Sequence, residues 1–324
     1  MPAYPDGASL LVVLIIALMI DIVAGDPAWL YRAVPHPVAL LGRAVSFLEV
    51  RWNDGQASSA RRRRLGALSV LLIAAGAAGL AWTLVYGLRQ FSWGWGVEAL
   101  AASTLLAFRG LHDHVRGVAS ALDEGTEAGR RAVAEIVGRD PASLDGPGVA
   151  RAAIESAAEN FADGVIAPAF WFLVAGLPGM AAYKAINTLD SMIGYPSPRH
   201  ADFGRAAARL DDAANLVPAR IAGVLIALAA TVIPGASGTE AWRAMVRDAP
   251  RHRSPNAGWP EAAMAGALGL ALAGPRQYTD ETVDDAWMGS GRLDADSPDI
   301  RRALVVYLGA GAIGAGLTGV GLLI

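Results

Sequence analysis

Residues 66–88 read GALSVLLIAAGAAGLAWTLVYGL, an apolar stretch with no Asp, Glu, Lys or Arg. A helix needs roughly 20 apolar residues to cross the hydrocarbon core of a bilayer, and this stretch is long enough. The arginine tract Arg61–Arg64 directly precedes it. Because positive charge is retained in the cytoplasm, the sequence predicts a membrane helix whose N-terminal end faces the cytoplasm.

Other apolar segments extend this pattern over the chain. Ala303–Ile324 is a second clear span, and Leu10–Val23 and Val217–Ile233 are plausible spans. Asp6 is the only charge before Leu10–Val23, so this segment lacks the basic start of a cleaved signal and is interpreted as a first membrane helix. Three shorter segments are predicted to be half-spanning, re-entrant or buried: Val97–Phe108, Val165–Ala182 and Ala262–Ala273.

The pattern predicts an all-α, polytopic membrane protein with residues 1–324 forming one integral membrane domain. Period-two alternation, the signal of strands, is essentially missing. Within this domain, residues 109–163 are predicted to form a cytoplasmic helical loop, since Leu111, Val115, Val118 and Leu122 recur at helical spacing. Arginines on both sides of Val217–Ile233 favour a cytoplasmic location for both of its ends. A single crossing cannot satisfy both, so the topology of this segment stays open.

Composition supports a membrane protein and excludes several kinds of site. Hydrophobic residues make up 54% and charged residues 18% of the chain, whereas soluble domains carry about a quarter charged residues. The net charge of −3 provides no basic field for nucleic acid. Cysteine is absent, which excludes disulfides, thiol nucleophiles and thiolate metal sites. No P-loop motif occurs, so a nucleotide would be held without one.

Acidic residues are densest between residues 151 and 163. Arg151, Glu155, Glu159 and Asp163 are four apart, so they form a stripe on one face of a helix, bordered by Asn160. Clustered carboxylates are suitable ligands for a hard cation such as Mg²⁺. The alternative interpretation is a solvated helix end in which Arg151 pairs with Glu155.

Two further polar clusters interrupt apolar segments. In the first, Lys184, Asn187, Thr188 and Ser191 share a helical face, with Asp190 one step round. This face either lines a wet cavity or joins helices by hydrogen bonds. The second cluster stands at the entry to an apolar span, and both a binding site and a solvated turn remain open for it. Its members are Arg205, Arg209, Asp211, Asp212, Asn215 and Arg220.

The loop after the first apolar segment carries Gly25-Asp26-Pro27 and Pro35-His36-Pro37. The two prolines restrict the backbone around His36 to an extended loop. Asp26 and His36 are interpreted either as ligand contacts or as ordinary loop residues.

These motifs occur in an order that resembles the CobD/CbiB family of cobalamin biosynthesis, from about residue 20 to about residue 290. The matching blocks are Gly25-Asp26-Pro27, His36-Pro37-Val38 with Gly42-Arg43, Ile136-Val137-Gly138-Arg139-Asp140, Glu155-Ser156-Ala157-Ala158-Glu159-Asn160, Asp163-Gly164-Val165-Ile166-Ala167-Pro168, the block from Tyr183 to Tyr195, Asp211-Asp212-Ala213-Ala214-Asn215, Pro218-Ala219-Arg220 and Ser254-Pro255-Asn256. Phe161-Ala162 and Tyr278-Thr279-Asp280 depart from the family pattern.

The resemblance implies ATP-dependent amide formation between a propionate of adenosylcobyric acid and an aminopropanol or ethanolamine phosphate, giving adenosylcobinamide phosphate. It implies ATP and Mg²⁺ as cofactors, an inner-membrane enzyme with its site facing the cytoplasm, and membrane lipid and other late cobalamin-pathway membrane enzymes as partners. The alternatives are a Mg²⁺-dependent membrane transferase acting on a diphosphate or lipid substrate, and a membrane transporter.

Site residues follow from the clusters and the resemblance together. Activation of a carboxylate by ATP requires neutralisation of phosphoryl charge. The expected catalytic residues are Glu155, Glu159, Asp163 and Asp190, and the expected Mg²⁺ ligands are Glu155, Glu159, Asp211 and Asp212. Substrate and phosphate contacts are expected from Asp26, His36, Arg43, Arg139, Asn160, Lys184, Asn187, Ser191, Arg205, Asn215 and Arg220.

Overall fold

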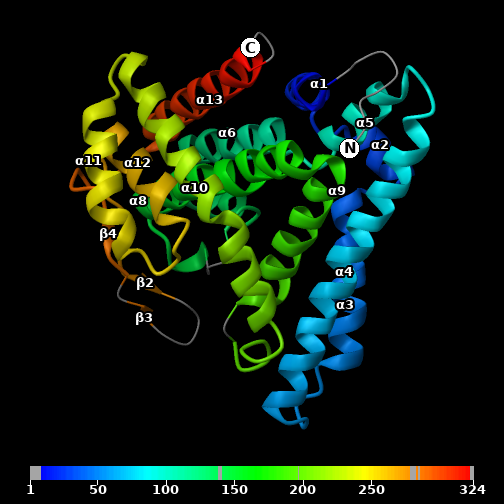
Figure 1. Cartoon of the computed structure of the whole chain (residues 1–324). Helices are drawn as coiled ribbons and strands as arrows, with labels where there is room; N and C mark the ends of the chain where they lie inside the picture. The colour runs from blue at the N-terminus through cyan, green and yellow to red at the C-terminus, as the bar shows by residue number, and fades with distance from the viewer. Residues whose placement is uncertain (1–8, 138–140, 196, 278–281, 284, 322–324) are drawn as a thin grey trace. The chain divides into compact units, whose positions relative to one another are not determined.

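The computed structural model describes residues 9–137, 141–195, 197–277, 282–283 and 285–321. Nearly all regular structure in these residues is helical, which confirms the predicted all-α class (Figure 1). The chain divides into two compact units. The first takes in chiefly residues 9–107 and 167–215, and the second takes in the described parts of 108–166 and 216–320. The prediction of one membrane domain over residues 1–324 stays a prediction.

The first unit consists of apolar helices. They are α1 (Leu10–Ala24), α2 (Ala28–Ala33), α3 (Pro37–Trp52), α4 (Ser59–Leu88), α5 (Gly94–Ser103), α9 (Ala167–Leu189), the π-helical turn η3 (Asp190–Gly194) and the start of α10 (Arg205–Val232).

The long helix α4 packs against α9 and α3. Ser58 caps its start by accepting a hydrogen bond from the Arg61 N–H at 3.4 Å. Gly66 is required at the crossing with the loop before α10, because a Cβ there would collide with the carbonyl of Phe203. Helix α9 bends at Ala175 and Gly176, where Gly176 has a φ of 65°, a left-handed conformation that glycine adopts at little cost.

A buried carboxylate fixes the loop between η3 and α10. Glu49 on α3 accepts two hydrogen bonds from Arg199, at 2.6 and 2.9 Å. Asn53 donates to the Arg199 carbonyl at 2.9 Å, and Arg62 donates to Asn53 at 3.0 Å. The bonds from Arg199 outweigh the effect of burial and hold the pKa of Glu49 below its ordinary value. This network joins the end of α3, the start of α4 and the loop.

The second unit holds helices around an alanine-rich core. They are α6 (Phe108–Glu124), α7 (Thr126–Val133), the 3-10 turn η1 (Pro141–Ser143), α8 (Gly146–Phe161), the π-helical turn η2 (Ala162–Ile166), the rest of α10, α11 (Gly238–Asp248), the 3-10 turn η4 (Ala249–Arg251), α12 (Gly258–Leu268) and α13 (Ser297–Val320). Leu111, Val115 and Val118 of α6 are buried, as their helical spacing indicates, and the cytoplasmic helical loop over residues 109–163 stays a prediction.

Two antiparallel ribbons precede α13. Strand β1 (Leu272–Ala273) pairs with β4 (Trp287–Met288), and β2 (Arg276–Gln277) pairs with β3 (Thr282–Val283). After β4, the Gly289 N–H donates to the buried carboxylate of Asp248 at 2.9 Å. Burial opposes ionisation of Asp248, but bonds from Arg247 and Gly289 outweigh it and hold the pKa of Asp248 low.

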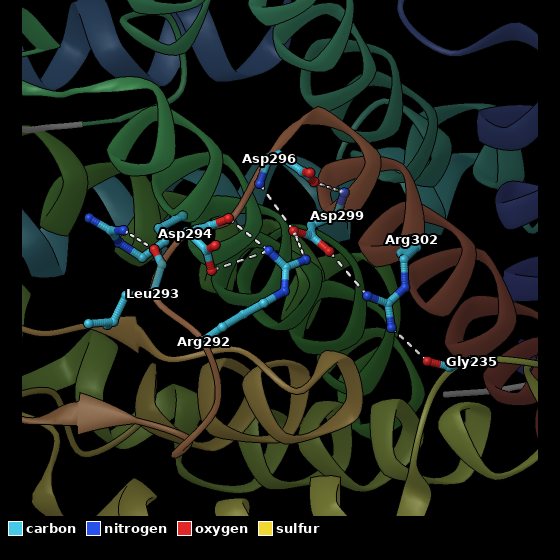
Figure 2. A network of polar contacts seen from close by, with 8 residues as sticks. Gly235, Arg292, Leu293, Asp294, Asp296, Asp299 and Arg302 are labelled. Carbon is cyan, nitrogen blue, oxygen red and sulfur yellow. Dashed lines mark hydrogen bonds and ion pairs between the residues drawn. The ribbon is translucent and has the colours of Figure 1, made fainter.

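Helix α13 begins with a reciprocal cap (Figure 2). Asp296 accepts from the Asp299 N–H at 3.0 Å, and Asp299 accepts from the Asp296 N–H at 3.1 Å, which is the arrangement of a capping box. Arg292 and Arg302 both donate to the Asp299 carboxylate. Arg302 also reaches the Gly235 carbonyl at 2.6 Å, so this ionic cluster joins α13 to the turn between α10 and α11.

Four helical segments of the described chain are long and apolar enough to cross a membrane: Ser59–Leu88, Gly146–Gly194, Arg205–Val232 and Ser297–Val320. The first contains the predicted span at residues 66–88, the third covers all but the last residue of the predicted span at 217–233, and the last covers most of the predicted span at 303–324. Helix α1 has 15 residues, which is shorter than the bilayer requires. The segments at 97–108 and 262–273 overlap the short helices α5 and α12. The segment at 165–182 instead lies within a longer helical run that bends at Gly176.

Candidate active site

A chain of hydrogen bonds between α9 and α10 forms the core of the candidate site in the first unit. The Tyr183 hydroxyl donates to Asn215 Oδ1 at 2.9 Å. Asn215 Nδ2 donates to Asp211 Oδ2 at 3.0 Å, and Asn187 Nδ2 donates to Asp211 Oδ1 at 3.3 Å. Each carboxylate oxygen of Asp211 therefore accepts one amide hydrogen bond, which orients the group.

These side chains are buried among apolar helices. Tyr183 and Asn215 are each 1% exposed, and Asp211 is 8% exposed. Buried polar groups need partners, because an unpaired one keeps the full cost of losing water. The ammonium of Lys184 attracts the Asp211 carboxylate, and the carboxylate of the neighbouring Asp212 repels it. The low dielectric constant of the buried site strengthens both the attraction between Lys184 and Asp211 and the repulsion between Asp212 and Asp211.

Backbone contacts hold the hydroxyls of this cluster. Thr188 Oγ1 donates to the Lys184 carbonyl at 2.7 Å, and Ser191 Oγ donates to the Asn187 carbonyl at 2.9 Å. Ser191 and Asp190 belong to the π-helical turn η3, a local widening that often occurs at functional sites. Gly194 ends this turn, and a Cβ there would collide with the Asp190 carboxylate.

The structure thus joins residues that the sequence presented as two clusters. Asn187 comes from the first, Asp211 and Asn215 from the second, and all three share one network. Tyr183 is a contact that the sequence did not single out, although it begins the same motif. The catalytic and binding roles of these residues stay predictions.

The second unit holds the predicted carboxylate stripe. Glu155 is 6% exposed, and its Oε1 accepts from the Ala273 N–H at 2.9 Å. Ala273 has a positive φ of 58°, so the Glu155 carboxylate supports a strained turn. Glu159 is exposed and Asp163 is half-buried. Because Asp163 lies in the π-helical turn η2, the four-residue spacing does not continue regularly to it.

Two neighbours of the stripe contact the backbone. Asn160 donates to the Ser156 carbonyl at 3.0 Å and to its hydroxyl at 3.2 Å. The Arg151 guanidinium donates to the Leu293 carbonyl and lies over the Trp287 ring, 5.9 Å from its centroid. Arg151 therefore holds the segment before α13.

Arg220, also in the second unit, has a fixed guanidinium. It donates to the Leu216 carbonyl at 2.7 Å and to Asn256 Oδ1 at 3.4 Å. Its guanidinium carbon lies 4.5 Å from the centroid of the Trp259 ring, a cation–π distance. Asn256 belongs to the Ser254-Pro255-Asn256 block, which is the sequence signal for its role. Trp259 belongs to none of the matching blocks and could not be identified from the sequence.

The loop before α12 contains a second feature that sequence reasoning missed. His252 Nδ1 lies 3.0 Å from the Ser254 backbone nitrogen and 3.2 Å from the Ser254 carbonyl oxygen. Its Nε2 lies 3.7 Å from Glu261 Oε2, and both side chains are buried. The pair stabilises the loop that presents Asn256 to Arg220.

The N-terminal loop brings Asp26 and His36 together. His36 Nε2 lies 3.4 Å from Asp26 Oδ1, and His36 Nδ1 caps α3 by accepting from the Val38 N–H at 3.1 Å. The ring of Tyr31 packs edge-on, 4.5 Å away, and burial together with Asp26 raises the pKa of Tyr31. His36 thus has a structural role whether or not it also binds a ligand.

The remaining predicted contacts lie apart from these networks. Arg43 and Arg205 are exposed on α3 and at the start of α10. Arg139 and the departure at Tyr278 fall outside the described residues.

Within the described part of the chain, no three His, Asp or Glu side chains gather closely enough to hold a metal ion. Asp190, Asp211 and Asp212 belong to the first unit, and Glu155, Glu159 and Asp163 to the second. Mg²⁺ commonly takes only one or two protein carboxylates and completes its shell with phosphate oxygens and water. The oxygen donors at Asp211 and Asp212 are of the right chemistry for that arrangement.

Comparison with known proteins agrees with the motif series. The chain matches the family model described as CobD/Cbib protein over residues 14–307. It is 52% identical over 302 residues to the "Cobalamin biosynthesis protein CobD" of Brucella anthropi, covering 92% of both chains. It is 49% identical over 315 residues to the protein of that name from Sinorhizobium sp., covering 95% of this chain and 97% of that one. No solved structure matches it. The chain therefore belongs to the CobD/CbiB protein family.

Proposed function

We propose that this chain is an enzyme of cobalamin biosynthesis that joins an aminoalcohol phosphate to a propionate of adenosylcobyric acid, using ATP. The observation that carries the proposal is the buried network of Asn187, Asp211 and Asn215 beside Lys184. Such a group of charges between apolar helices is costly in a membrane protein and marks a functional site by default. Family membership and the names of the relatives support a role in this pathway.

The reaction needs two displacements. A carboxylate oxygen of the propionate attacks the γ-phosphorus of ATP, which releases ADP and leaves an acyl phosphate. The amine nitrogen of the aminoalcohol phosphate then attacks the acyl carbon, and the C–O bond to phosphate breaks. The amine loses a proton and the product is an amide. Mg²⁺, when bound, neutralises charge on the transferring phosphoryl group.

The residues of this chain supply charge and orientation. Lys184 is a compact cation that attracts phosphate oxygens. Asn187 and Asn215 fix the Asp211 carboxylate, which together with Asp212 would supply oxygen ligands to Mg²⁺. Arg220, fixed by Asn256 and Trp259, serves as a second phosphate-binding centre with a forked geometry.

We propose that the protein lies in the inner membrane with this site facing the cytoplasm, where ATP is available. The arginines at the start of α4 support this orientation. A cysteine introduced at Ser58 is expected to react with a membrane-impermeant maleimide only after the cells are opened. Labelling in intact spheroplasts would contradict the orientation.

The function is tested with detergent-purified protein, adenosylcobyric acid, ATP, Mg²⁺ and either aminopropanol phosphate or ethanolamine phosphate. The expected result is one ADP released per amide formed, with no product when any component is omitted. Corrinoid uptake into vesicles without amide formation would contradict the proposal and indicate a transporter.

A further inference from the structure

The exposed face of α3 combines apolar and cationic side chains. Leu40, Arg43, Phe47, Val50 and Arg51 recur at helical spacing on that face, and Phe47 and Val50 are 62% and 75% exposed. The guanidinium of Arg51 lies 5.8 Å from the centroid of the Phe47 ring. A hollow of about 720 Å³ opens here, lined by the small residues Ala39, Gly42 and Ser46 together with Phe47, Val50 and both arginines.

The start of α4 lies beside the end of α3 and adds further arginines (Figure 1). Two of them have partners within the protein, since Arg62 donates a hydrogen bond to Asn53 and Arg63 forms an ion pair with Asp202 at 2.7 Å. In the described residues, four exposed arginines at these two helices have no carboxylate partner. They are Arg43, Arg51, Arg61 and Arg64.

An apolar band adjoins these cations. Leu68, Leu71 and Leu72 follow the arginines on α4 and are exposed. A cationic band next to an apolar band is the pattern of a helix end at the boundary between lipid headgroups and acyl chains. Clusters of arginine immediately cytoplasmic of a membrane helix attract anionic lipids.

We propose that the α3–α4 face binds an anionic phospholipid, with its phosphate at Arg51 and Arg64 and an acyl chain in the hollow beside Phe47. The charge of the face argues against a second copy of the chain as its occupant. A two-fold interface would bring the same patch of both subunits together and place their unpaired arginines against one another. The lipid supplies the missing negative charge, and the proposal does not depend on the catalytic function.

The test measures melting of the intact protein in detergent while dioleoylphosphatidylglycerol is added, with dioleoylphosphatidylcholine as the neutral lipid. The variant R51Q/R64Q removes two charges and keeps Arg43 and three of the four arginines at the start of α4. The matched control R116Q/R131Q removes two exposed arginines from α6 and α7 that have no carboxylate partner in the described chain. Each basic residue near an anionic surface contributes about fivefold in affinity.

Phosphatidylglycerol is expected to raise the melting temperature of wild type and control at lower concentration than phosphatidylcholine. In R51Q/R64Q the half-maximal concentration should rise about 25-fold, and R51K/R64K should restore it because charge is kept. Equal responses to both lipids, or an unchanged response of R51Q/R64Q, would overturn the proposal. Stabilisation of the wild type by inorganic phosphate alone would also overturn it. A wild-type dimer that dissociates in the F47S variant while lipid binding persists would overturn it as well.

Discussion

The amide of Asn187 on α9 donates a hydrogen bond to the carboxylate of Asp211 on α10 across 3.3 Å. Asn215 holds the other oxygen of the same carboxylate at 3.0 Å. Two helices together therefore determine the position of this carboxylate.

Replacement of Asp211 by Asn keeps the size of the side chain and removes its charge. We expect the Asp211→Asn variant to lose at least about 100-fold in kcat while it remains folded, because interaction with developing charge is lost. Amide formation and melting are measured on one preparation. Asp113→Asn, at an exposed residue of α6, is the control and should retain wild-type activity. A folded Asp211→Asn variant with near-normal kcat at saturating Mg²⁺ would remove Asp211 from the mechanism.

Lys184 and Arg220 are expected to respond differently to substitution. Lys184→Ala should lower turnover strongly, because a compact charge near phosphate is lost. Arg220→Lys should raise the apparent KM of one phosphate substrate more than it lowers kcat, if the guanidinium supplies uniform binding. Steady-state kinetics with ATP and with the aminoalcohol phosphate check both. Unchanged KM values with lowered melting temperatures would show that both residues only hold helices together.

Gly194 offers a test of the π-helical turn. A methyl group there would collide with the Asp190 carboxylate, so Gly194→Ala should displace Asp190 and lower kcat at least about tenfold. Gly55→Ala is the matched control, since nothing lies within 4 Å of an added Cβ at that position. Activity of Gly194→Ala equal to that of Gly55→Ala would show that the position of Asp190 does not matter.

Acid should weaken the network around Glu49. Bonds from Arg199 lower the pKa of folded Glu49 below its ordinary value of 4.5. A carboxyl group with a lowered folded pKa contributes stability above its unfolded pKa and loses it as the pH falls through the folded pKa. Melting temperature should therefore fall as the pH drops below about 4.5. The Glu49→Gln variant should have a lower melting temperature at pH 7. Its melting temperature should fall less steeply in acid, and the remaining fall should come from other groups with a lowered pKa, such as Asp248. An equally steep loss in Glu49→Gln would contradict this assignment.

The membrane helices could be predicted because their signal is local. Residues 66–88 are continuously apolar and follow four arginines, and length and charge suffice to identify α4. The bend in α9 could not be predicted in the same way. It depends on the left-handed conformation of Gly176, and a glycine in an apolar run does not reveal whether its φ is positive.

The site could be predicted in part for a related reason. The sequence showed which polar residues interrupt apolar segments, but helical spacing relates only residues on one helix. The contact of Asn187 with Asp211 joins two helices and requires the tertiary fold. The pairing of His252 with Glu261 was missed because the two residues are nine positions apart on either side of a turn, where no periodicity connects them.

We propose that ATP activates the corrinoid propionate as an acyl phosphate at this site. The most direct measurement uses adenosylcobyric acid labelled with ¹⁸O in the reacting carboxylate and follows the oxygen by mass spectrometry. The account predicts one ¹⁸O atom in the inorganic phosphate for each amide formed. Amide formation with no ¹⁸O in the phosphate would contradict it.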